Sequence, residues 1–351
     1  MPERRAIFAV PGDPDTPTGG YGYDRRMASE LRAAGWAIDV LRLPDGFPDP
    51  TPEALSQACA LLRAQPEGVP LLVDGLALGA MPRIGSVLGP RRPLVALVHH
   101  PLAMETGLSQ ARATALRESE RRALAAARRV VATSRATAAV LSAEYAVPTA
   151  LITVVPPGTD PAARAVGSNG SPLRLLSVGT LVRRKGHDVL LDALARLQAL
   201  SWHLTIVGDA TRDPDTADAL RAAVRRLGLA QRVALAGAVD WDRLQTHYSG
   251  ADLFVLASRH EGYGMAFTEA LARGLPVVGT RAGAIGEAIP AGAALLVPPD
   301  DAAALAATLR ALLTDPAARR DLADVAWRAA ATLPRWPASA ALLAQVLQAA
   351  S

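Results

Sequence analysis

The residues best suited to chemistry lie between positions 258 and 274, in the run SRHEGYGMAFTEALARG. The pattern predicts a loop and a short helix between two strands. Gly262 and Gly264 allow a backbone to approach a ligand closely. A helix that begins near Gly264 directs free N–H groups and the positive end of its dipole towards whatever binds there. The sequence therefore predicts an anion site at this turn, and a diphosphate matches it best.

Two carboxylates flank the turn. Glu261 ends the predicted strand, and Glu269 lies inside the helix, about 80° further round at 100° per residue. Both can face one cleft. A carboxylate repels a diphosphate, so the expected partners of the two residues are neutral hydroxyls such as those of a ribose or another sugar. The alternative is that Glu261 is an ordinary loop charge and Glu269 a solvent-exposed helix residue.

A second cationic turn, 178–188, follows the first strand of the same half and contains Arg183, Arg184 and Lys185. Lys185 is the only lysine among 37 basic residues. Its compact charge suits phosphate oxygens better than a planar guanidinium does. Because the carboxyl ends of parallel strands share one edge of a sheet, the two turns are expected to meet over one crevice. A solvated basic turn before a helix is the alternative.

The first half of the chain offers two weaker signals. A glycine-containing loop with Gly19 and Gly20 follows the first strand, and it lacks the GxGxxG order of dinucleotide-binding proteins. His99 and His100 end a later strand. Because strand side chains alternate, one of these two histidines points into a crevice and the other packs away. Ordinary turn chemistry and a packed histidine are the alternatives.

Short apolar runs alternate with amphipathic helical stretches along the whole chain, as in βα units on parallel sheets. The predicted strands are 6–10, 37–43, 69–73, 93–99, 130–133, 173–178, 204–207, 233–236, 253–256, 276–279 and 294–297, and helices include 23–34, 52–64 and 109–129. A Pro/Gly/Ser-rich break divides the pattern. We therefore expect an α/β protein with a first doubly wound domain at 1–160, a linker at 161–172 and a second domain at 173–334. The terminal helix 335–351 is expected to cross back to the first domain. A continuous eight-unit barrel is the alternative.

Composition excludes several classes of protein. Of 351 residues, 50% are hydrophobic and 20% charged, which is typical of a globular chain. The net charge of +4 is scattered, so no nucleic-acid partner is predicted. Cys59 is the single cysteine, and neither a secretory signal nor a membrane-spanning run is found, which favours the cytoplasm. No residues have metal-ligand spacing, so no metal is predicted.

The stretch 109–129 predicts a basic helix, with six arginines against two glutamates. A solvated basic face is one interpretation. The other is peripheral contact with an anionic inner membrane face.

The turn 178–188 and the Glu261…Glu269 signature together resemble the retaining, nucleotide-sugar-dependent glycosyltransferases of family 4. The similarity extends to VVPPGTD at 154–160 and AALLVPPD at 293–300. It implies a GT-B fold, in which two Rossmann-like doubly wound domains face each other. It also implies an enzyme without cofactor or metal.

The resemblance further implies roles for the donor-site residues. Lys185 and an arginine would bind the diphosphate. Many members place that arginine directly after the turn glycine, where this chain has Thr180, so either Arg183 or Arg184 replaces it or the charge is missing. Glu269 would hold the ribose hydroxyls and Glu261 those of the donor sugar.

Backbone N–H groups of the same loop would cradle the phosphates. The residues concerned are Gly262, Tyr263, Gly264 and Met265. In the first domain, Gly19 and Gly20 would lie beside the donor phosphates. A histidine would lie close to the transferred sugar: His99 and His100 both remain open, with His100 nearer the following loop.

The expected function is transfer of a hexose-type sugar from a UDP- or GDP-sugar to a hydroxyl acceptor, which could be a small molecule, a glycan or a lipid-linked sugar. The resemblance implies retention of the anomeric configuration. His100, Lys185 and Glu261 are the expected catalytic residues. Two alternatives remain: a non-catalytic nucleotide-sugar binding module, which the missing arginine at Thr180 favours, and a GT-B epimerase or phosphorylase.

Overall fold

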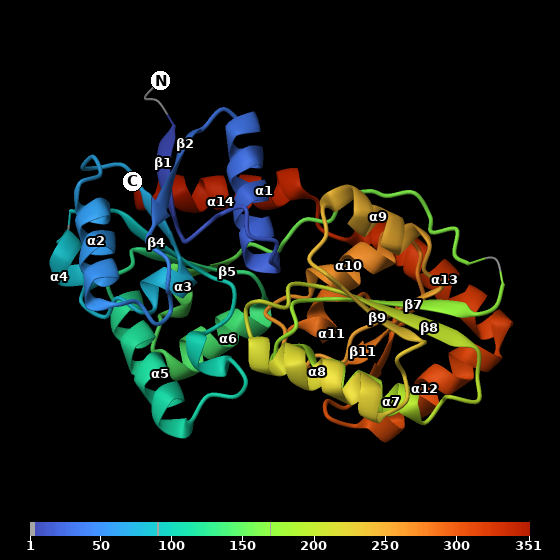
Figure 1. Ribbon diagram of the computed structural model, residues 1–351. Helices are drawn as coiled ribbons and strands as arrows, with labels where there is room; N and C mark the ends of the chain where they lie inside the picture. Colours follow the sequence, from blue (N-terminus) through green and yellow to red (C-terminus); the bar gives the residue numbers. More distant parts are fainter. Residues whose placement is uncertain (1–3, 90, 169) are drawn as a thin grey trace. The chain divides into compact units, whose positions relative to one another are not determined.

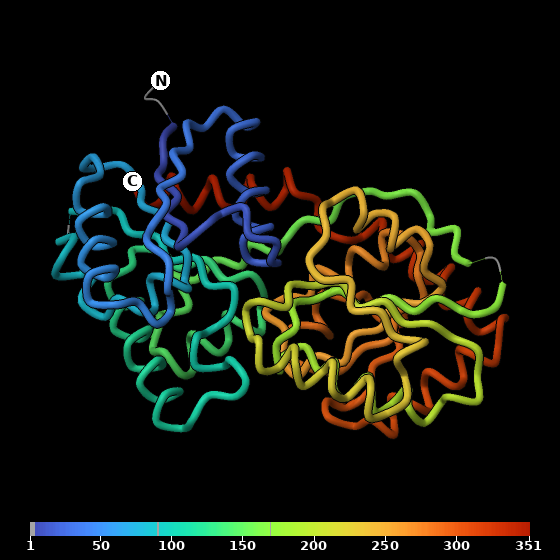
Figure 2. The backbone as a smooth tube through the Cα atoms, viewed as in Figure 1, coloured from blue at the N-terminus to red at the C-terminus, as the bar shows by residue number. Residues whose placement is uncertain are grey.

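The computed structural model describes residues 4–89, 91–168 and 170–351. The chain forms two compact units, residues 1–158 with 334–351 and residues 159–333 (Figure 1). The backbone leaves the first unit after Gly158 and returns to it at Pro334 (Figure 2). Each unit contains one parallel sheet of six strands.

The sheet of the first unit has the strand order β2-β1-β3-β4-β5-β6, and every pair is parallel. The strands are β1 (Arg5–Pro11), β2 (Ala37–Leu43), β3 (Leu71–Asp74), β4 (Leu94–Val98), β5 (Arg129–Ala132) and β6 (Ile152–Val154). The chain adds β2 on one side of β1 and then places β3 on the other. This reversal creates a topological switch point between β1 and β3, where ligands of open α/β sheets bind.

Helices cover the sheet of the first unit. They are α1 (Gly19–Ala33), α2 (Pro52–Arg63), α3 (Gly75–Leu78), α4 (Ile84–Leu88), η1 (Leu102–Met104), α5 (Gln110–Leu124), α6 (Arg135–Glu144), η2 (Thr149–Leu151) and α14 (Trp336–Ala350). Leu62, Leu124 and Leu141 from α2, α5 and α6 are buried in one apolar core with strand residues. The C-terminal helix α14 packs against α1, β4 and β5, so it is part of this unit.

The second unit repeats the architecture with the strand order β12-β11-β10-β7-β8-β9. Its strands are β7 (Leu173–Val178), β8 (Trp202–Val207), β9 (Val233–Gly237), β10 (Leu253–Val255), β11 (Val277–Thr280) and β12 (Leu295–Val297). Here β8 and β9 extend the sheet from one side of β7, and β10 lies on the other side. The switch point is therefore between β7 and β10.

The helices of the second unit form two groups, each with its own apolar core. The elements are η3 (Arg183–Lys185), α7 (His187–Ala195), α8 (Pro214–Arg226), α9 (Trp241–Ser249), α10 (Met265–Leu271), α11 (Ile285–Ala288), α12 (Ala302–Thr314), α13 (Pro316–Ala329) and η4 (Ala330–Thr332). Leu190, Leu220 and Leu309 bury α7, α8 and α12 in one core. Phe267 and Ala326 bury α10 and α13 in the other.

The predicted strands are all present, with ends displaced by at most two residues. Two predicted helix ends are wrong, and one strand was not predicted. Helix α1 begins at Gly19 and not at Tyr23, because Thr18 caps it through the backbone N–H of Tyr21. Helix α5 ends at Leu124, since the chain must extend to form β5 from Arg129. Strand β6 was not expected.

The described residues of the predicted linker 161–172, which are 161–168 and 170–172, belong to the second unit and hydrogen-bond within it. The N–H of Ala165 donates to Arg273 O at 2.9 Å, and the N–H groups of Val166 and Gly167 donate to Ser249 O at 2.9 and 3.0 Å. Pro/Gly/Ser composition marks an irregular segment, but these bonds tie the segment to one unit.

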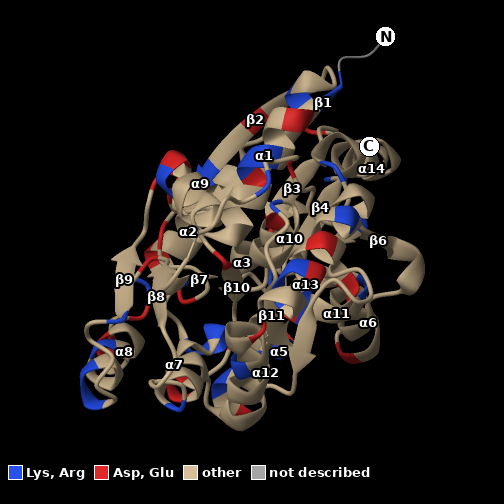
Figure 3. Ribbon diagram, turned by 90° about the vertical axis from the view of Figure 1, so that its right-hand side faces the viewer, with Lys and Arg blue, Asp and Glu red and all other residues tan. Residues whose placement is uncertain are grey.

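Charged residues of both signs are interspersed on the helices (Figure 3). On the basic helix α5, Arg112 pairs with Asp49, Arg117 with Glu144 at 3.3 Å, and both Arg121 and Arg122 with Glu118. Four arginines of the stretch 109–129 thus have carboxylate partners within the protein. Among the described residues, no helix combines the length and apolarity that crossing a bilayer requires.

Candidate active site

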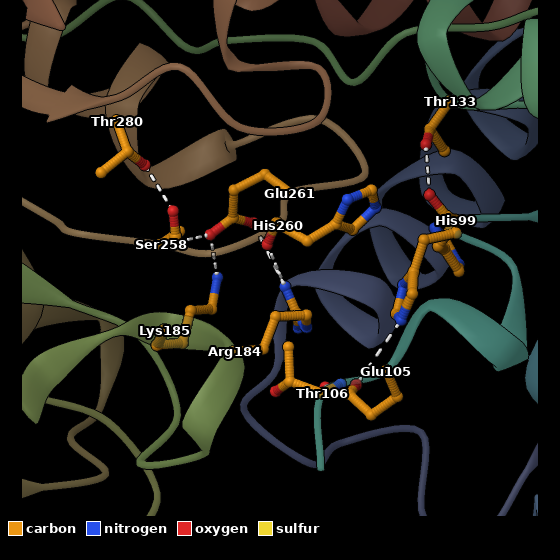
Figure 4. Close-up of polar contacts among 11 residues, drawn as sticks. His99, Glu105, Thr106, Thr133, Arg184, Lys185, Ser258, His260, Glu261 and Thr280 are labelled. Carbon is orange, nitrogen blue, oxygen red and sulfur yellow. Dashed lines mark hydrogen bonds and ion pairs between the residues drawn. The ribbon is translucent and has the colours of Figure 1, made fainter. Parts of the chain in front are cut away.

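Lys185 and Glu261 form an ion pair at the switch point of the second unit (Figure 4). Lys185 Nζ donates to Glu261 Oε1 at 2.7 Å, and Ser258 Oγ donates to the same oxygen at 2.6 Å. Arg184 Nη1 lies 3.5 Å from Glu261 Oε2 and donates to His260 O at 3.0 Å. The two turns predicted to share a crevice therefore meet at the carboxyl ends of β7 and β10.

Two glycines make this approach possible. Gly186 has a positive φ of 63° and is the N-cap residue directly before α7, and a Cβ on it would overlap the carbonyl oxygen of Ala257. The turn can therefore lie directly against the end of β10. A Cβ on Gly179 would be 3.1 Å from Cδ of Lys185, so the bare backbone there leaves room for the lysine side chain.

The cluster holds an ionised carboxylate beside two cations. Glu261 is only 5% exposed, and burial alone would raise its pKa. The charges of Lys185 and Arg184 and the hydrogen bonds from Lys185 and Ser258 outweigh burial and lower the pKa of Glu261 to about 2. Glu261 can therefore only accept hydrogen bonds, and the three charged side chains leave one net positive charge for an anion.

The two arginines that could replace the one missing at Thr180, Arg183 and Arg184, have different surroundings. Arg184 is half-buried beside Glu261, whereas Arg183 is exposed. Arg259 fixes the turn from outside: it donates to Arg183 O at 2.6 Å, to Asp188 at 2.9 and 2.7 Å, and to Asp300 at 2.6 Å. This role of Arg259 could not be predicted from the sequence, because its partners lie 41 to 76 residues away along the chain.

The loop 262–265 turns sharply into α10. Gly264 has a φ of 105° and precedes the first helical residue, Met265, whose N–H is one of the helix-start groups without an intrahelical partner. Tyr263 is buried, and burial raises its pKa to about 12, so it is a neutral phenol. The predicted arrangement of glycines before a helix start is thus present.

Gly283 is a site residue that the sequence analysis missed. Its φ is 56°, and a Cβ on it would overlap the carbonyl oxygen of Glu261. That oxygen accepts a hydrogen bond from the N–H of Ala284 at 2.9 Å. The turn 283–284 therefore fixes the backbone of Glu261, and only glycine fits.

Glu269 has a separate environment on α10. Tyr248 Oη donates to Glu269 Oε2 at 2.8 Å, and the Arg273 guanidinium lies 4.5 Å from the Tyr248 ring centroid. The pKa of Glu269 is raised by burial, although the hydrogen bond from Tyr248 and the charge of Arg273 lower it in part. Tyr248 went unnoticed in the sequence because its position on α9 gives no hint of a contact with α10.

In the first unit, His99 and His100 differ in their partners. His99 Nε2 lies 3.1 Å from Asp24 Oδ1 and 3.1 Å from Asp74 Oδ2. His100 Nε2 lies 3.6 Å from Glu105 Oε2. Gly19 and Gly20, expected in a loop, are the first residues of α1, and a Cβ on Gly20 would touch the His99 ring at 3.5 Å.

Two family models match the chain. The model described as Glycosyltransferase Family 4 matches residues 68–163, and the model described as Glycosyl transferases group 1 matches residues 172–315. Together they match 240 of the 351 residues and include the whole Lys185–Glu261 region. The chain belongs to the family 4 glycosyltransferases.

Curated relatives support the same family assignment. The mannosylfructose-phosphate synthase of Agrobacterium fabrum is 34% identical over 200 residues, which are 51% of this chain and 44% of that protein. A D-inositol 3-phosphate glycosyltransferase of an Arthrobacter species is 33% identical over 226 residues, 60% of this chain and 53% of that one. The chain spans about half the length of these relatives.

Solved structures show the same fold over nearly the whole chain. Sucrose-phosphate synthase from Thermosynechococcus elongatus has a TM-score of 0.84 at 23% identity, covering 99% of this chain and 100% of its own. Anabaena Alr3699/HepE, solved in complex with UDP-glucose, has a TM-score of 0.77 at 19% identity. The match covers 98% of this chain and 99% of that protein. The predicted GT-B class, with two doubly wound parallel-sheet domains, is confirmed.

Proposed function

We propose that the chain transfers a hexose-type sugar from a UDP- or GDP-sugar to a hydroxyl acceptor, with retention at the anomeric carbon. The observation that carries the proposal is the cluster of Lys185, Arg184 and Glu261, in which two cations flank one ionised carboxylate at the β7/β10 switch point. Such a site offers charge for a diphosphate and an acceptor for hydroxyls.

The donor would separate the Lys185–Glu261 ion pair, because its diphosphate would bind the cations and its sugar would bind the carboxylate. Diphosphate oxygens bind Lys185 and Arg184, and the donor-sugar hydroxyls donate to the Glu261 carboxylate, which Ser258 keeps oriented. As the glycosidic bond breaks, negative charge grows on the leaving diphosphate. Fixed cations stabilise that charge more in the transition state than in the ground state, which is how they accelerate the reaction.

The remaining donor contacts come from the neighbouring loop and helix. Backbone N–H groups of 262–265 supply further donors to the phosphates, and Glu269 accepts from the ribose hydroxyls while Tyr248 holds its other oxygen. Relatives agree with this proposal: one solved neighbour was crystallised in complex with UDP-glucose, and curated relatives include a glycosyltransferase and a synthase.

Retention follows if the acceptor attacks on the face that the diphosphate leaves, with a phosphate oxygen taking the acceptor proton. Side-chain cations supply the positive charge that the leaving diphosphate needs, so we propose transfer without a divalent metal. We also propose that the reaction takes place in the cytoplasm. The acceptor, whether a small molecule, a glycan or a lipid-linked sugar, belongs to the first unit with His99 and His100. Contact of 109–129 with a membrane stays a prediction.

The competing proposal, a non-catalytic nucleotide-sugar binding module, rests on Thr180 standing where many relatives have an arginine. Arg184 weakens it, because its guanidinium already lies 3.5 Å from Glu261 beside Lys185.

Thermal shift with UDP-, GDP-, ADP- and dTDP-sugars tests donor binding, because a ligand of the folded state alone raises the melting temperature. One nucleotide class should stabilise the wild type and Arg225→Ala, an exposed charge on α8, but not Lys185→Ala. Product formation with that donor then separates enzyme from binding module. Absence of a shift with every donor contradicts the proposal.

A further inference from the structure

Three side chains from different elements meet at the switch point of the first unit. Asp74 is the last residue of β3, His99 directly follows β4, and Asp24 lies in the second turn of α1. Asp24 is 2% and Asp74 3% exposed. The position corresponds in topology to that of Lys185 and Glu261 in the second unit, and it is where a doubly wound sheet binds its ligand.

The His99 ring is held on several sides. One nitrogen, Nε2, faces both carboxylates at 3.1 Å. The Tyr23 ring meets the imidazole edge to face, with centroids 5.2 Å apart and an interplanar angle of 83°. Gly20 lies beneath the ring, and His99 O accepts a hydrogen bond from Thr133 Oγ1 at 3.0 Å.

Asp74 is itself fixed, because its Oδ1 accepts from the N–H of Leu76 at 2.7 Å and caps α3. The ring therefore has a defined orientation before any ligand binds.

This arrangement determines which nitrogen can meet a substrate. A nitrogen that faces two carboxylate oxygens must carry a proton. Within the described residues, the other nitrogen, Nδ1, has no hydrogen-bond partner, and the side chain is 20% exposed. Among titratable groups, Asp24 and Asp74 face the ring and Tyr23 packs on it. Because the ring is protonated at Nε2 and faces two carboxylates, their negative charge favours the imidazolium form, in which Nδ1–H is a second hydrogen-bond donor.

The pKa directions agree with this geometry. Burial alone would lower the pKa of His99, but the charge of Asp24 and the hydrogen bonds to both aspartates raise it to about 10. Burial raises the pKa of Asp24 to about 7 against the opposing charge of His99. The pKa of His99 is therefore shifted in the direction that an imidazolium facing carboxylates requires.

We propose that Asp24 and Asp74 are positioning residues that hold His99 as an imidazolium, so that its Nδ1–H donates to an oxygen of a carbohydrate substrate. This inference rests on the proposed function for its substrate. It means that His99 is a fixed donor and not a general base, since no lone pair is left on the ring. The oxygen can belong to the donor sugar or to the acceptor.

Nitrogen-15 NMR of histidine-labelled full-length chain tests the ring state without using activity. His99, assigned by the resonances lost in His99→Gln, should show the imidazolium pattern at neutral pH. It should become neutral in Asp24→Asn/Asp74→Asn. Asparagine can still cap α3 at position 74, which protects the fold. Glu120→Gln is the matched control and should leave the pattern unchanged, because this buried carboxyl on α5 accepts its hydrogen bond from the N–H of Leu102. A neutral His99 in the wild type overturns the proposal.

A double-mutant cycle tests the positioning role. His99→Gln should lower kcat by roughly 10²-fold, the usual loss for one fixed donor, and Asp74→Asn by roughly tenfold. If Asp74 acts through His99, the double variant should be no slower than His99→Gln alone, whereas independent effects would multiply. Multiplicative losses therefore contradict the proposal, and unchanged melting temperatures show that each variant folds.

Three further outcomes are distinguishable. A KM that rises for only the donor, or only the acceptor, supports the proposal and identifies the source of the oxygen. One polar atom each of Asp24, Asp74 and His99 lies within 4.8 Å of the other two, so the group is also able to hold a metal ion. Activation by a divalent cation that disappears in Asp74→Asn would therefore overturn the proposal in favour of a metal site. Failure of the wild type to transfer any sugar removes the proposed function, while the NMR result for His99 still stands.

Discussion

The Lys185 ammonium lies 2.7 Å from the Glu261 carboxylate, although the two residues are 76 positions apart in the chain. The contact joins the first and fourth strands of the second unit at the edge where all carboxyl ends gather. Each charge is the ion-pair partner of the other. Under the proposed function, Lys185 would bind the diphosphate of the donor and Glu261 the sugar hydroxyls, so both residues would exchange this contact for contacts with substrate.

Glu261→Gln should reduce turnover sharply, because the amide keeps the shape of the side chain but loses the charge that accepts from sugar hydroxyls. We expect kcat to fall by roughly 10²-fold, the loss typical of one electrostatic contact in a site. Donor binding through Lys185 and Arg184 should persist in thermal shift. Turnover close to that of the wild type would rule out the role assigned to Glu261.

The same substitution should change the stability of the protein in acid. The pKa of Glu261 is lowered from 4.5 to about 2 on folding, so its stabilisation is complete above pH 4.5 and disappears as the pH falls towards 2. The full effect is about 3 kcal/mol at 1.4 kcal/mol per unit. Urea unfolding of wild type and Glu261→Gln between pH 6 and 3 should show the wild-type advantage shrinking with acid. A constant difference would contradict the assignment.

How much of this was predictable depends on the kind of contact. Alternating apolar runs predicted both sheets, and the rule that parallel strands share one carboxyl edge brought Lys185 towards Glu261. The rule works because strand direction and order are properties of the whole sheet and do not depend on side-chain packing.

Packing partners were not predictable in the same way. Tyr248 meets Glu269 only because α9 and α10 pack together, and Asp24 meets His99 only because α1 covers the end of β4. Each of these residues looks ordinary within its own helix. An aspartate on the buried face of α1 and another ending a wholly apolar strand were nevertheless usable signals, because a buried carboxyl needs a partner.

Gly283→Ala should damage the site, whereas Gly286→Ala should not. Position 283 has a positive φ and no room for a Cβ beside the Glu261 carbonyl, while nothing lies within 4 Å of a Cβ at Gly286. We expect Gly283→Ala to lower stability by about 1–3 kcal/mol and to weaken donor binding. Thermal unfolding with and without donor measures both effects. Equal behaviour of the two alanine variants would show that the turn does not fix Glu261.

Tyr248→Phe should weaken nucleotide binding without disturbing the core. The ring stays packed against Phe254, at 6.2 Å between centroids, and only the hydroxyl that orients Glu269 is lost. A hydrogen bond to a charged group contributes about 1.5–3 kcal/mol, so donor KM should rise by roughly tenfold or more. Isothermal titration with the nucleoside diphosphate alone gives the same comparison. An unchanged Kd would separate Tyr248 from ribose recognition.

Glu120 provides a pH prediction of the opposite sign. This carboxyl on α5 is 1% exposed and accepts from the N–H of Leu102 at 2.9 Å, and burial raises its pKa from 4.5 to about 8. The folded state therefore holds a proton that the unfolded state releases, and stability falls by up to about 1.4 kcal/mol per unit as the pH rises from 4.5 towards 8.

Glu120→Gln is close in shape to the protonated acid and keeps an acceptor for Leu102, so it should remove this slope. Near pH 5 the variant and the wild type should be similar in stability, and by pH 8 the variant should be the more stable. Urea unfolding at those two pH values measures the difference. A wild-type advantage that grows with pH would mean that Glu120 is ionised in the folded protein and that its charge, not its proton, holds the loop after His100.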